Sequence, residues 1–338
     1  MTVITTIQKP TDAVRQFVSR MRDFDAKLIV IGDQKGPSAF DLEGVGFLSL
    51  HDQCALPFEL SRKLPTGHYT RKNIGYLAAI DQGASCIYET DDDNAPLNNW
   101  APRLKIIKAV RLTGSGWINV YRLFTDEYIW PRGFPLDEVM NTFQRTLSLG
   151  DESLSVRAPV QQGLVNNSPD VDAVWRLLFA RSFTFLKGES VLLSKGSWCP
   201  FNSQSTWWWP DAYPLLYLPS YCSFRMTDIW RSFIAQRCLW EMGCGVVFHP
   251  PEVVQERNKH NLMRDFADEI PGYTRNKEFV LLLEGLTLET GVASVSSNLQ
   301  HCYEALIRAG FFPEKELVLV NTWLEDLQKL RVKIEQQY

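Results

Sequence analysis

The chain has 338 residues, of which 45% are hydrophobic, so it is long enough to bury a sizeable core in one large domain or in a domain with an appended subdomain. Its 35 basic and 39 acidic side chains give a net charge of −4, which provides no electrostatic reason to expect nucleic acid or an anionic membrane surface as a partner. No apolar run approaches the roughly 18 residues of a membrane helix, and no signal-peptide pattern opens the chain.

The seven cysteines are scattered along the chain and form no C-x-x-C pair. This pattern supports neither a zinc ribbon nor a thioredoxin-like motif, and it favours buried, reduced thiols. The sequence therefore predicts a soluble, cytoplasmic protein.

The first third of the chain has the pattern of a βαβ unit. Short apolar runs predict strands over Lys27–Asp33 and Val45–Leu50, and the first of them ends in a glycine and an acid. A helix is expected over Arg71–Ala84, closed at Gly83, and a third strand runs over Ser85–Thr90 into three aspartates. This order favours a mixed or parallel sheet whose carboxyl edge presents ligand groups.

The rest of the chain gives weaker signals until its final helices. The expected elements are a strand over Ile118–Phe124, a helix opening at Leu136, a long structured loop over Trp198–Phe224, a helix over Asp228–Gly243, a strand in VVFHPP that the prolines stop, and helices after Lys277. We expect an α/β core over residues 1–270 and a helical C-terminal extension over 271–338 that packs on it.

The three consecutive aspartates, Asp91, Asp92 and Asp93, allow two interpretations. Like charges this close repel one another and raise each other's pKa, so such a cluster is either solvated or holds a cation. Mg²⁺ and Mn²⁺ take one or two protein carboxylates and complete their ligands with water and phosphate oxygens. The residues alone leave open a solvated acidic turn and a metal–diphosphate site, and they exclude an EF-hand loop, which needs a Gly and a terminal Glu at fixed positions.

The stretch RKNIGYLAAIDQGASCIYETDDDN resembles the pattern of GT-A glycosyltransferases, the superfamily that transfers sugars from nucleotide diphosphates. The resemblance implies a GT-A-type, Rossmann-like mixed sheet flanked by helices. It implies that Arg71 and Asn73 border the nucleotide, that Asp33 contacts the base or ribose, and that Asp91 and Asp92 meet the donor. Asp91 and Asp93 would hold Mn²⁺ or Mg²⁺, with His249 as a third ligand; a packed structural histidine is the alternative for His249.

A second stretch, FRMTDIWRSFIAQRCLWEMGCGVVFHPP, resembles the segment of the same enzymes in which an acid opens a helix. In that family the acid is the general base that deprotonates the acceptor hydroxyl. By motif the residue here is Asp228, for which a routine N-cap is the alternative role.

A narrower resemblance covers most of the chain. Four segments together resemble the STELLO family of glycosyltransferase-like proteins: RKNIGYL, YIWPRGFPLDEV, VQQGLVNNSPDVDAVWRL and DIWRSFIAQRCLWEMG. Plant members of that family are anchored Golgi proteins, so the resemblance implies a location at the periphery of a membrane or in a Golgi-associated complex as the alternative to the cytoplasm. The PRGFPL tract is also similar to the UDP-arabinopyranose mutases, or reversibly glycosylated polypeptides. By that analogy Arg132 lies near a phosphate or sugar; an ion pair is the other interpretation.

Two further groups of residues allow both a functional and a structural interpretation. Asp170 and Asp172 either reach a ligand or cap a helix, and Trp207, Trp208 and Trp209 either stack on an acceptor sugar or anchor a loop in the core.

The resemblances together imply a metal-dependent, inverting glycosyltransferase that uses a nucleotide-diphosphate sugar, with a UDP-sugar favoured, and a carbohydrate or glycoconjugate acceptor. Two alternatives stay open: a UDP-sugar mutase of the reversibly glycosylated type, and a catalytically silent GT-A-like protein that acts in assembly.

Overall fold

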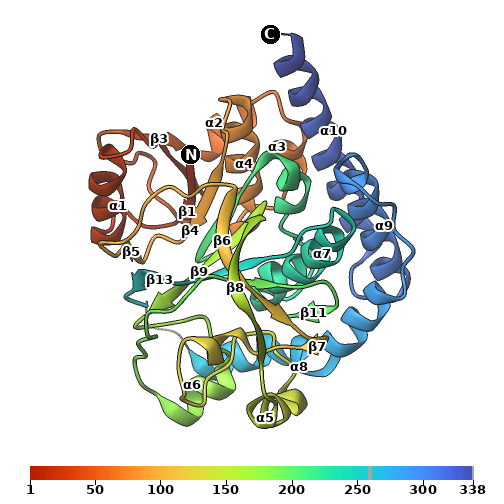
Figure 1. Ribbon diagram of the computed structural model, residues 1–338. Coiled ribbons are helices and arrows are strands. Elements are labelled where there is room, and N and C mark those ends of the chain that lie inside the picture. The colour runs from red at the N-terminus through yellow and green to blue at the C-terminus, as the bar shows by residue number, and fades with distance from the viewer. Residues whose placement is uncertain (258–260, 337–338) are drawn as a thin grey trace.

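The computed structural model describes residues 1–257 and 261–336, and it confirms an α/β fold with a large mixed sheet flanked by helices (Figure 1). In spatial order the main path of the sheet is β3 (Val45–Leu48), β2 (Leu28–Gly32), β1 (Thr2–Thr6), β4 (Ile87–Thr90), β12 (Ser205–Trp208), β9 (Val160–Asn166), β13 (Val247–Gln255), β10 (Val191–Leu193), β6 (Ile106–Thr113) and β8 (Ser148–Arg157). An eleventh strand, β5 (Asn94–Pro96), pairs with β13. A separate two-stranded sheet joins β7 (Gly116–Trp117) to β11 (Ser197–Trp198).

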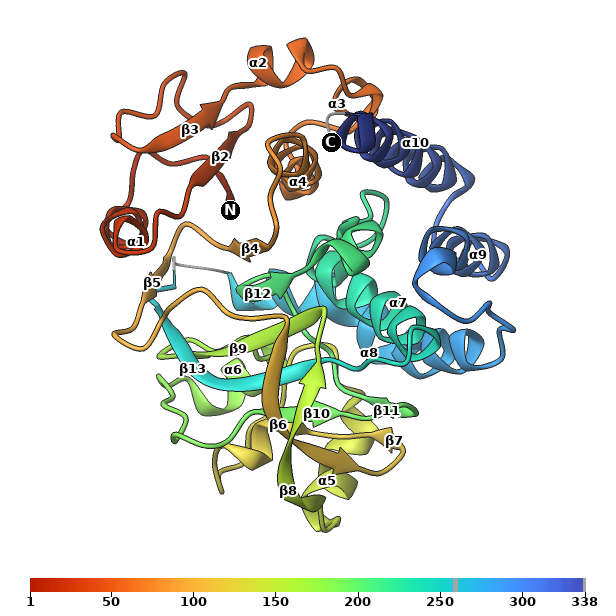
Figure 2. The ribbon, with the colours of Figure 1, turned by 45° about the horizontal axis from the view of Figure 1, so that its top comes forward.

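The helices lie on both faces of the sheet and dominate the C-terminal third of the chain (Figures 1 and 2). They are α1 (Asp12–Arg22), α2 (Leu50–Ala55), α3 (Glu59–Lys63), α4 (Lys72–Asp81), α5 (Leu136–Gln144), α6 (Ala173–Phe179), α7 (Thr227–Glu241), α8 (Leu262–Glu284), α9 (Val295–Arg308) and α10 (Glu314–Gln336). None of the described helices combines the length and the apolar composition needed to cross a membrane.

The N-terminal half of the sheet is parallel. Strand β1 pairs in parallel with β2 on one side and with β4 on the other, and β2 pairs in parallel with β3. The chain leaves β1 through α1 toward β2, so β1 and β4 form the point at which the strand order changes direction. In open α/β sheets, ligands bind outside the carboxyl ends of the strands at such a point.

Helix α4 packs directly on this parallel part of the sheet. A Cβ atom at Gly75 would lie 2.5 Å from the Val3 side chain and 2.8 Å from that of Ile31, so only glycine allows the helix this close to β1 and β2. Residues 72–80 of the helix are buried on all its sides, as expected for a core helix. The close packing fixes the start of α4 near the carboxyl end of β4.

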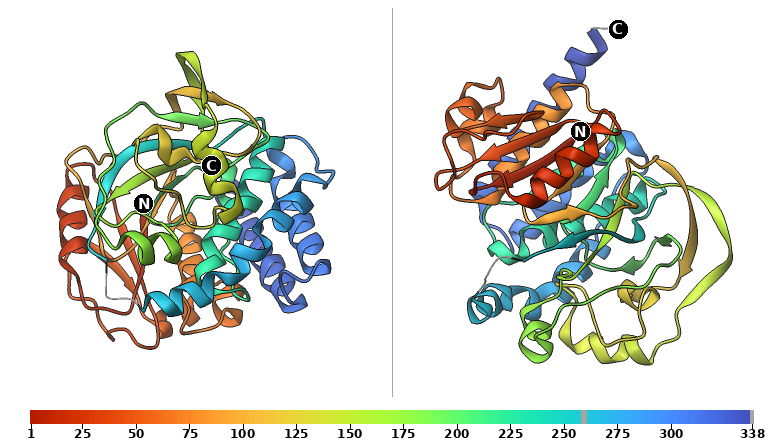
Figure 3. Two further views of the ribbon diagram at one scale, coloured as in Figure 1. Left: turned by 90° about the horizontal axis from the view of Figure 1, so that it is seen from below. Right: turned by 90° about the vertical axis from the view of Figure 1, so that its left-hand side faces the viewer.

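The other half of the sheet is mixed. Strand β12 runs antiparallel to β4 and to β9, β9 runs parallel to β13, and β8 forms the edge by pairing antiparallel with β6. The β6–β8 ribbon lies on the opposite side of the molecule from β3 and α1 (Figure 3). The acidic loop and this ribbon therefore occupy distant parts of one sheet.

The C-terminal helices share the core of the body. Helix α10 contacts α3, α4 and α9, and its far end projects from the molecule (Figure 1). Near its start, the buried Glu316 carboxylate accepts hydrogen bonds from the backbone N–H groups of Ser220 and Tyr221 and from the Tyr217 hydroxyl. Residues of α7 through α10 belong to the same buried apolar cluster as α4. The last two residues of the expected C-terminal extension lie outside the described part of the chain.

Several expected elements are confirmed and several are wrong. The strands expected from Lys27, Val45 and Ser85 form β2, β3 and β4, and the helices expected from Arg71, Leu136 and Asp228 form α4, α5 and α7. The strand expected over Ile118–Phe124 is a 3₁₀ helix over Val120–Leu123, because a short apolar run cannot distinguish a strand from a buried helical turn.

The region after Trp198 is also more regular than expected. Residues Ser205–Trp208 form the central strand β12, and Trp207, Trp208 and Trp209 are buried, which confirms the core interpretation of these tryptophans. Strand β13 continues through Pro250 and Pro251, where its pairing with β9 is irregular, as expected for residues that lack an N–H donor. The C-terminal helices begin with α8, before the expected Lys277.

Candidate functional site

The three aspartates lie just beyond the end of β4, at the carboxyl edge of the parallel strands, and each meets a partner from a different element. Asp91 accepts a hydrogen bond from Lys72 Nζ at the start of α4 (3.1 Å). Asp92 accepts one from the Thr6 hydroxyl at the end of β1. Asp93 accepts one from Gln255 Nε2 at the end of β13 (3.0 Å). The loop is therefore built into the sheet edge, unlike a freely solvated turn.

Partial burial and mutual repulsion disfavour the ionised forms of Asp91 and Asp92. Burial raises the pKa of Asp91 to about 6, because the charges of Asp93 and Asp228 add to the effect of burial and the Lys72 ammonium offsets it only in part. Burial likewise raises the pKa of Asp92, and the charge of Asp91 adds to this rise. A cation at this position would stabilise the ionised forms.

Asp228 lies in the first turn of α7 and is held by a buried arginine. Arg132 Nη2 donates to both Asp228 oxygens, at 3.0 and 2.9 Å, and the same guanidinium forms two hydrogen bonds to Asp170, at 2.8 and 2.9 Å. All three side chains are at least nine-tenths buried. Arg132 thus makes the ion pair that was one of its two predicted roles, and one partner is the predicted general base.

The pKa of Asp228 reflects this pairing. Burial alone would raise the pKa of its carboxyl, but the charge and hydrogen bonds of Arg132 outweigh burial and lower the pKa below the usual range. The Asp228 backbone N–H donates to the Tyr69 hydroxyl (3.1 Å), and Ser203 N–H donates to the carboxylate (3.3 Å). Asp228 is therefore ionised at neutral pH and makes no N-cap hydrogen bond, so the alternative role of a routine cap is not what the structure shows.

A second buried ion pair joins the helix of Asp228 to the strand that carries the acidic loop. Arg231 donates two hydrogen bonds to Glu89, at 3.0 and 2.7 Å, with both side chains almost completely buried. Arg231 lies one turn after Asp228, and Glu89 lies two residues before Asp91. Tyr76 and Trp208 also donate to the Glu89 carboxylate. This network fixes the relative position of α7 and β4.

Asp33 lies at the same edge, at the end of β2, and organises the neighbouring loop. Its carboxylate accepts hydrogen bonds from the backbone N–H groups of Gly67 and His68, both at 2.9 Å, and from that of Gln34. The His68 ring stacks on Tyr69, whose hydroxyl meets the Asp228 backbone. The structure therefore connects Asp33 to the surroundings of Asp228, with the carboxylate engaged by its own chain.

Arg71 and Asn73 point into the body of the protein, away from the acidic loop. The Arg71 guanidinium donates to the Gln53 side chain and to two backbone carbonyls of the α3 region, and Asn73 exchanges two hydrogen bonds with the backbone of Leu218. Both side chains are buried. In this arrangement they shape the start of α4, while Lys72, between them in the sequence, reaches the loop.

The structure does not bring His249 to the acidic loop. Its two ring nitrogens are engaged by Ser190 Oγ (2.6 Å) and Gln161 Oε1 (2.9 Å), and burial holds its pKa well below the usual range. Along β13 it lies six residues before Gln255, a run of about 20 Å at the rise of a strand. The packed structural role is the one that the structure supports for His249, since the ring has no nitrogen left for a metal.

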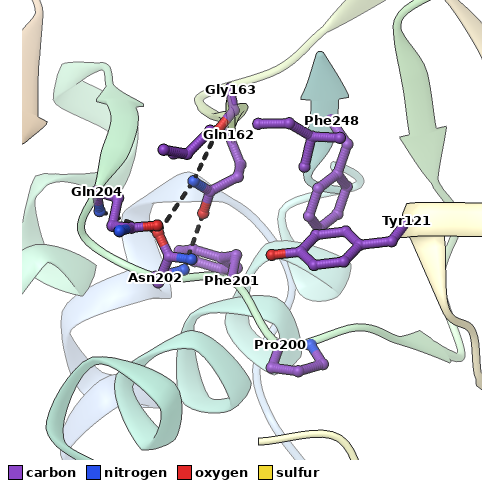
Figure 4. Close-up of a pocket in the computed structure, with 10 residues that line it drawn as sticks. Tyr121, Gln162, Gly163, Pro200, Phe201, Asn202, Gln204 and Phe248 are labelled. Carbon is purple, nitrogen blue, oxygen red and sulfur yellow. Dashed lines mark hydrogen bonds between the residues drawn. The ribbon is translucent and has the colours of Figure 1, made fainter. Parts of the chain in front are cut away.

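A small cavity lies between β9, β13 and the segment that leads into β12 (Figure 4). It is lined by Gln162, Asn202 and Gln204 together with apolar side chains, and its volume is about 10 Å³. The Gln162 amide donates to Asn202 Oδ1 and to a backbone carbonyl, and the Asn202 N–H donates back to Gln162 Oε1. The space suits at most a single water molecule, so it is too small to be a donor pocket.

Asp170 and Asp172 have different roles. Asp170 belongs to the cluster around Arg132, whereas Asp172 caps α6 by accepting a hydrogen bond from Trp175 N–H (2.8 Å). The residues that sequence reasoning missed are Lys72, Thr6, Tyr69 and Ser203. Only Lys72 carried a signal, since it stands inside the R-K-N triplet that opens the predicted helix.

These observations define a class of protein: an α/β domain with an acidic loop and a buried acid–arginine pair near the switch point of its parallel strands. The sequence model of the STELLO glycosyltransferases matches residues 225–337. Over 96% of its length the chain is 27% identical to "Probable glycosyltransferase STELLO1" and 26% identical to "Probable glycosyltransferase STELLO2", both from Arabidopsis thaliana. The expected resemblance to the STELLO glycosyltransferases is confirmed, and with these two relatives it extends over most of the chain. It spans 44% of the length of each of these two relatives.

Proposed function

We propose that the chain is a metal-dependent glycosyltransferase. It transfers a sugar from a nucleotide-diphosphate sugar, with a UDP-sugar favoured, to a hydroxyl acceptor, and the configuration at the anomeric carbon is inverted. One observation carries the proposal: the buried Arg231–Glu89 ion pair joins α7, three residues after Asp228, to β4, two residues before Asp91, so the helix of the acid is fixed to the strand of the acidic loop. Their position outside the carboxyl ends of parallel strands suits a nucleotide ligand.

The acidic loop fits a divalent cation of the Mg²⁺ or Mn²⁺ type. No group of three or more His, Cys, Asp or Glu side chains is arranged to hold a metal among residues 1–257 and 261–336. Such a group is not required, since these ions take one or two carboxylates and fill the remaining positions with phosphate oxygens and water. The charges of Asp93 and Asp228 add to the raised pKa of Asp91, and a bound cation would favour its ionised form. Asp91 and Asp93 would hold the ion, which when bound supplies Lewis-acid stabilisation to a diphosphate leaving group.

The protein's own residues provide the remaining chemistry. The buried Lys72 ammonium, bonded to Asp91, adds a fixed positive charge beside the place where charge develops on the leaving group. The Asp228 carboxylate accepts the proton of the acceptor hydroxyl as that oxygen attacks. Its pairing with Arg132 keeps it ionised and makes it a weak base, so it takes the proton only as the attacking oxygen becomes acidic.

A donor-hydrolysis screen tests the proposal. The protein is incubated with UDP- and GDP-sugars, with Mn²⁺ or with EDTA, and release of the nucleotide is measured. We expect release from one donor that needs the metal and is lost in Asp91→Asn, while Asp151→Asn, which changes an exposed acid on β8, serves as the matched control. Equal release with EDTA, or equal release by Asp91→Asn and wild type, would contradict the metal-dependent transfer.

The mutase remains the second candidate because Arg132, from the tract shared with the mutases, lies in contact with Asp228. A mutase interconverts ring forms of a UDP-sugar and needs no acceptor. Incubation with UDP-sugars alone, followed by analysis of ring size, separates the two: a changed ring form without any acceptor identifies the mutase, and an unchanged donor pool favours transfer.

A further inference from the structure

A second cavity lies at the opposite end of α7 from Asp228. It has a volume of about 370 Å³, within the range of small-molecule sites, and is bounded by β6, β8 and β10 and by the turn that follows α7. Asp228 and Trp240, which lines the cavity, are 12 residues apart on α7, about 18 Å along the helix axis. A ligand in this cavity would therefore not touch the candidate donor site.

The lining of this cavity is cationic although the whole chain is acidic. Three of its twelve lining residues are basic, namely Arg111, Arg157 and Lys195, and none is acidic. Arg111 is exposed, and its guanidinium forms no ion pair with the part of the chain that the structure describes. A net charge of −4 over the molecule makes this concentration of positive charge local to the cavity.

The two carboxylates at its margin do not neutralise these cations. Asp211 is shared between Arg157 and Lys105, and Glu241 is shared between Lys195 and Arg237. The Lys195 contact is long, 3.3 Å, with its side chain 64% exposed, and such surface pairs are weak. With Arg111, five cationic side chains meet two carboxylates, so an anionic ligand finds positive charge that the protein does not satisfy.

Neutral groups complete the lining. Ser194 also lines the cavity, while its buried hydroxyl oxygen has no hydrogen-bond partner within the described chain. Trp240 is 8% exposed and packs on Trp198 with ring centroids 4.4 Å apart, which holds its indole rigidly beside the cationic groups. This combination suits a ligand with an anionic group and a small organic body.

We propose that the cavity formed by Arg111, Arg157, Ser194, Lys195, Trp240 and Cys244 is a second binding site, for a small, soluble phosphorylated molecule. The inference is independent of the proposed transfer reaction, because it rests on residues remote from the acidic loop. Phosphate oxygens accept charge-assisted hydrogen bonds from arginine and lysine, and the cavity volume suits a phosphorylated compound of metabolite size.

Cysteine protection tests the proposal. Cys244 lines the cavity and is partly exposed, whereas Cys54 is exposed and lies elsewhere, so one protein carries both the reporter and the internal reference. The full chain is treated with N-ethylmaleimide in EDTA, with and without sodium pyrophosphate, and modification of each cysteine is followed by peptide mass spectrometry. At ten times the dissociation constant, we expect alkylation of Cys244 to slow about tenfold and that of Cys54 to stay unchanged.

Variant proteins and a parallel experiment with lipid vesicles show whether the protection is specific to this cavity. The double variant Arg111→Ala/Lys195→Ala should lose the protection, while Lys108→Ala, an exposed lysine of β6 that does not line the cavity, should keep it. No slowing at Cys244, equal slowing at both cysteines, or undiminished protection in the double variant would overturn the site. Protection by phosphatidylserine vesicles without protection by pyrophosphate would overturn the assignment to a soluble ligand.

Discussion

The two ends of α7 lie beside side chains of opposite charge, and these charges differ in how far they are buried and paired. At the N-terminal end, Asp228 and Asp170 are buried, and both are matched to Arg132 through specific hydrogen bonds. At the C-terminal end, basic side chains are exposed and share too few carboxylates. Removal of a buried partner leaves an uncompensated charge in a low-dielectric interior, whereas removal of an exposed one leaves water to solvate the rest. The first end should therefore be sensitive to substitution in activity and stability, and the second only in binding.

The largest effect is expected from Asp228→Asn. If Asp228 accepts the proton of the acceptor, the amide should reduce transfer by about 100- to 10,000-fold while nucleotide affinity stays within about twofold of wild type. Steady-state transfer and nucleotide binding are measured on the same preparations, with Asp151→Asn as the control. Transfer at the wild-type rate would remove Asp228 from the mechanism.

The next effect concerns the ion pair that joins α7 to β4. Arg231→Met should lower the free energy of unfolding by about 3–5 kcal/mol, because it leaves Glu89 charged and buried without its partner. Denaturant unfolding measures the loss. Arg62→Met breaks the exposed pair with Glu59 and should cost less than about 1 kcal/mol. Equal losses in the two variants would show that burial does not set the difference.

The next prediction is a pH dependence of the protein's stability that arises from Asp172. Burial raises the pKa of this carboxyl to about 7, so the folded protein holds the proton more tightly than the unfolded chain does. Its contribution to stability is therefore greatest near pH 4 and is lost as the pH rises toward about 7. Asn at this position keeps an N-cap acceptor and cannot ionise.

Unfolding of Asp172→Asn and wild type over a range of pH measures this effect. The variant should match wild type near pH 4 and exceed its unfolding free energy at pH 8 by up to about 4 kcal/mol, since each unit of a pKa difference between the folded and unfolded states is worth about 1.4 kcal/mol. A stability difference that does not change with pH would contradict the buried, proton-binding role of Asp172.

The smallest effect is expected at the cationic end. Arg111→Ala should change the free energy of unfolding by no more than about 0.5 kcal/mol, since its guanidinium is exposed and makes no ion pair with the described residues. Denaturant unfolding at low and at high salt checks this, and a loss above about 2 kcal/mol would place Arg111 in the structural core of the fold.

The sequence predicts the elements whose signals are local. Three signals can be recognised without information from the rest of the chain: the apolar run of β2, the glycine that closes α4 and the apolar pattern of α7. Strand β12 and the middle of β13 were missed because tryptophans and prolines read as loop signals, and only their sheet partners make them strands.

The site could be predicted in part for the same reason. The acidic loop and Asp228 are recognisable as motifs, and the Arg231–Glu89 ion pair joins the two elements that carry them. The direction of side chains on a helix buried on every side is set by its neighbours. Arg71 and Asn73 therefore turn toward α3 and Leu218, while Lys72 reaches Asp91. Likewise, Ser190 and Gln161, which occupy the His249 ring, come from other strands or loops and leave no trace beside it in the sequence.

The most direct test of the central claim is calorimetry with UDP and GDP, with and without Mn²⁺, on wild type, Asp93→Ala and the control Asp151→Ala. If the loop after β4 holds a metal–diphosphate, one nucleotide should bind wild type and the control only with Mn²⁺, and Asp93→Ala should lose at least about tenfold in affinity. Binding that does not depend on the metal and is unchanged in Asp93→Ala, or no binding of either nucleotide, would contradict the account.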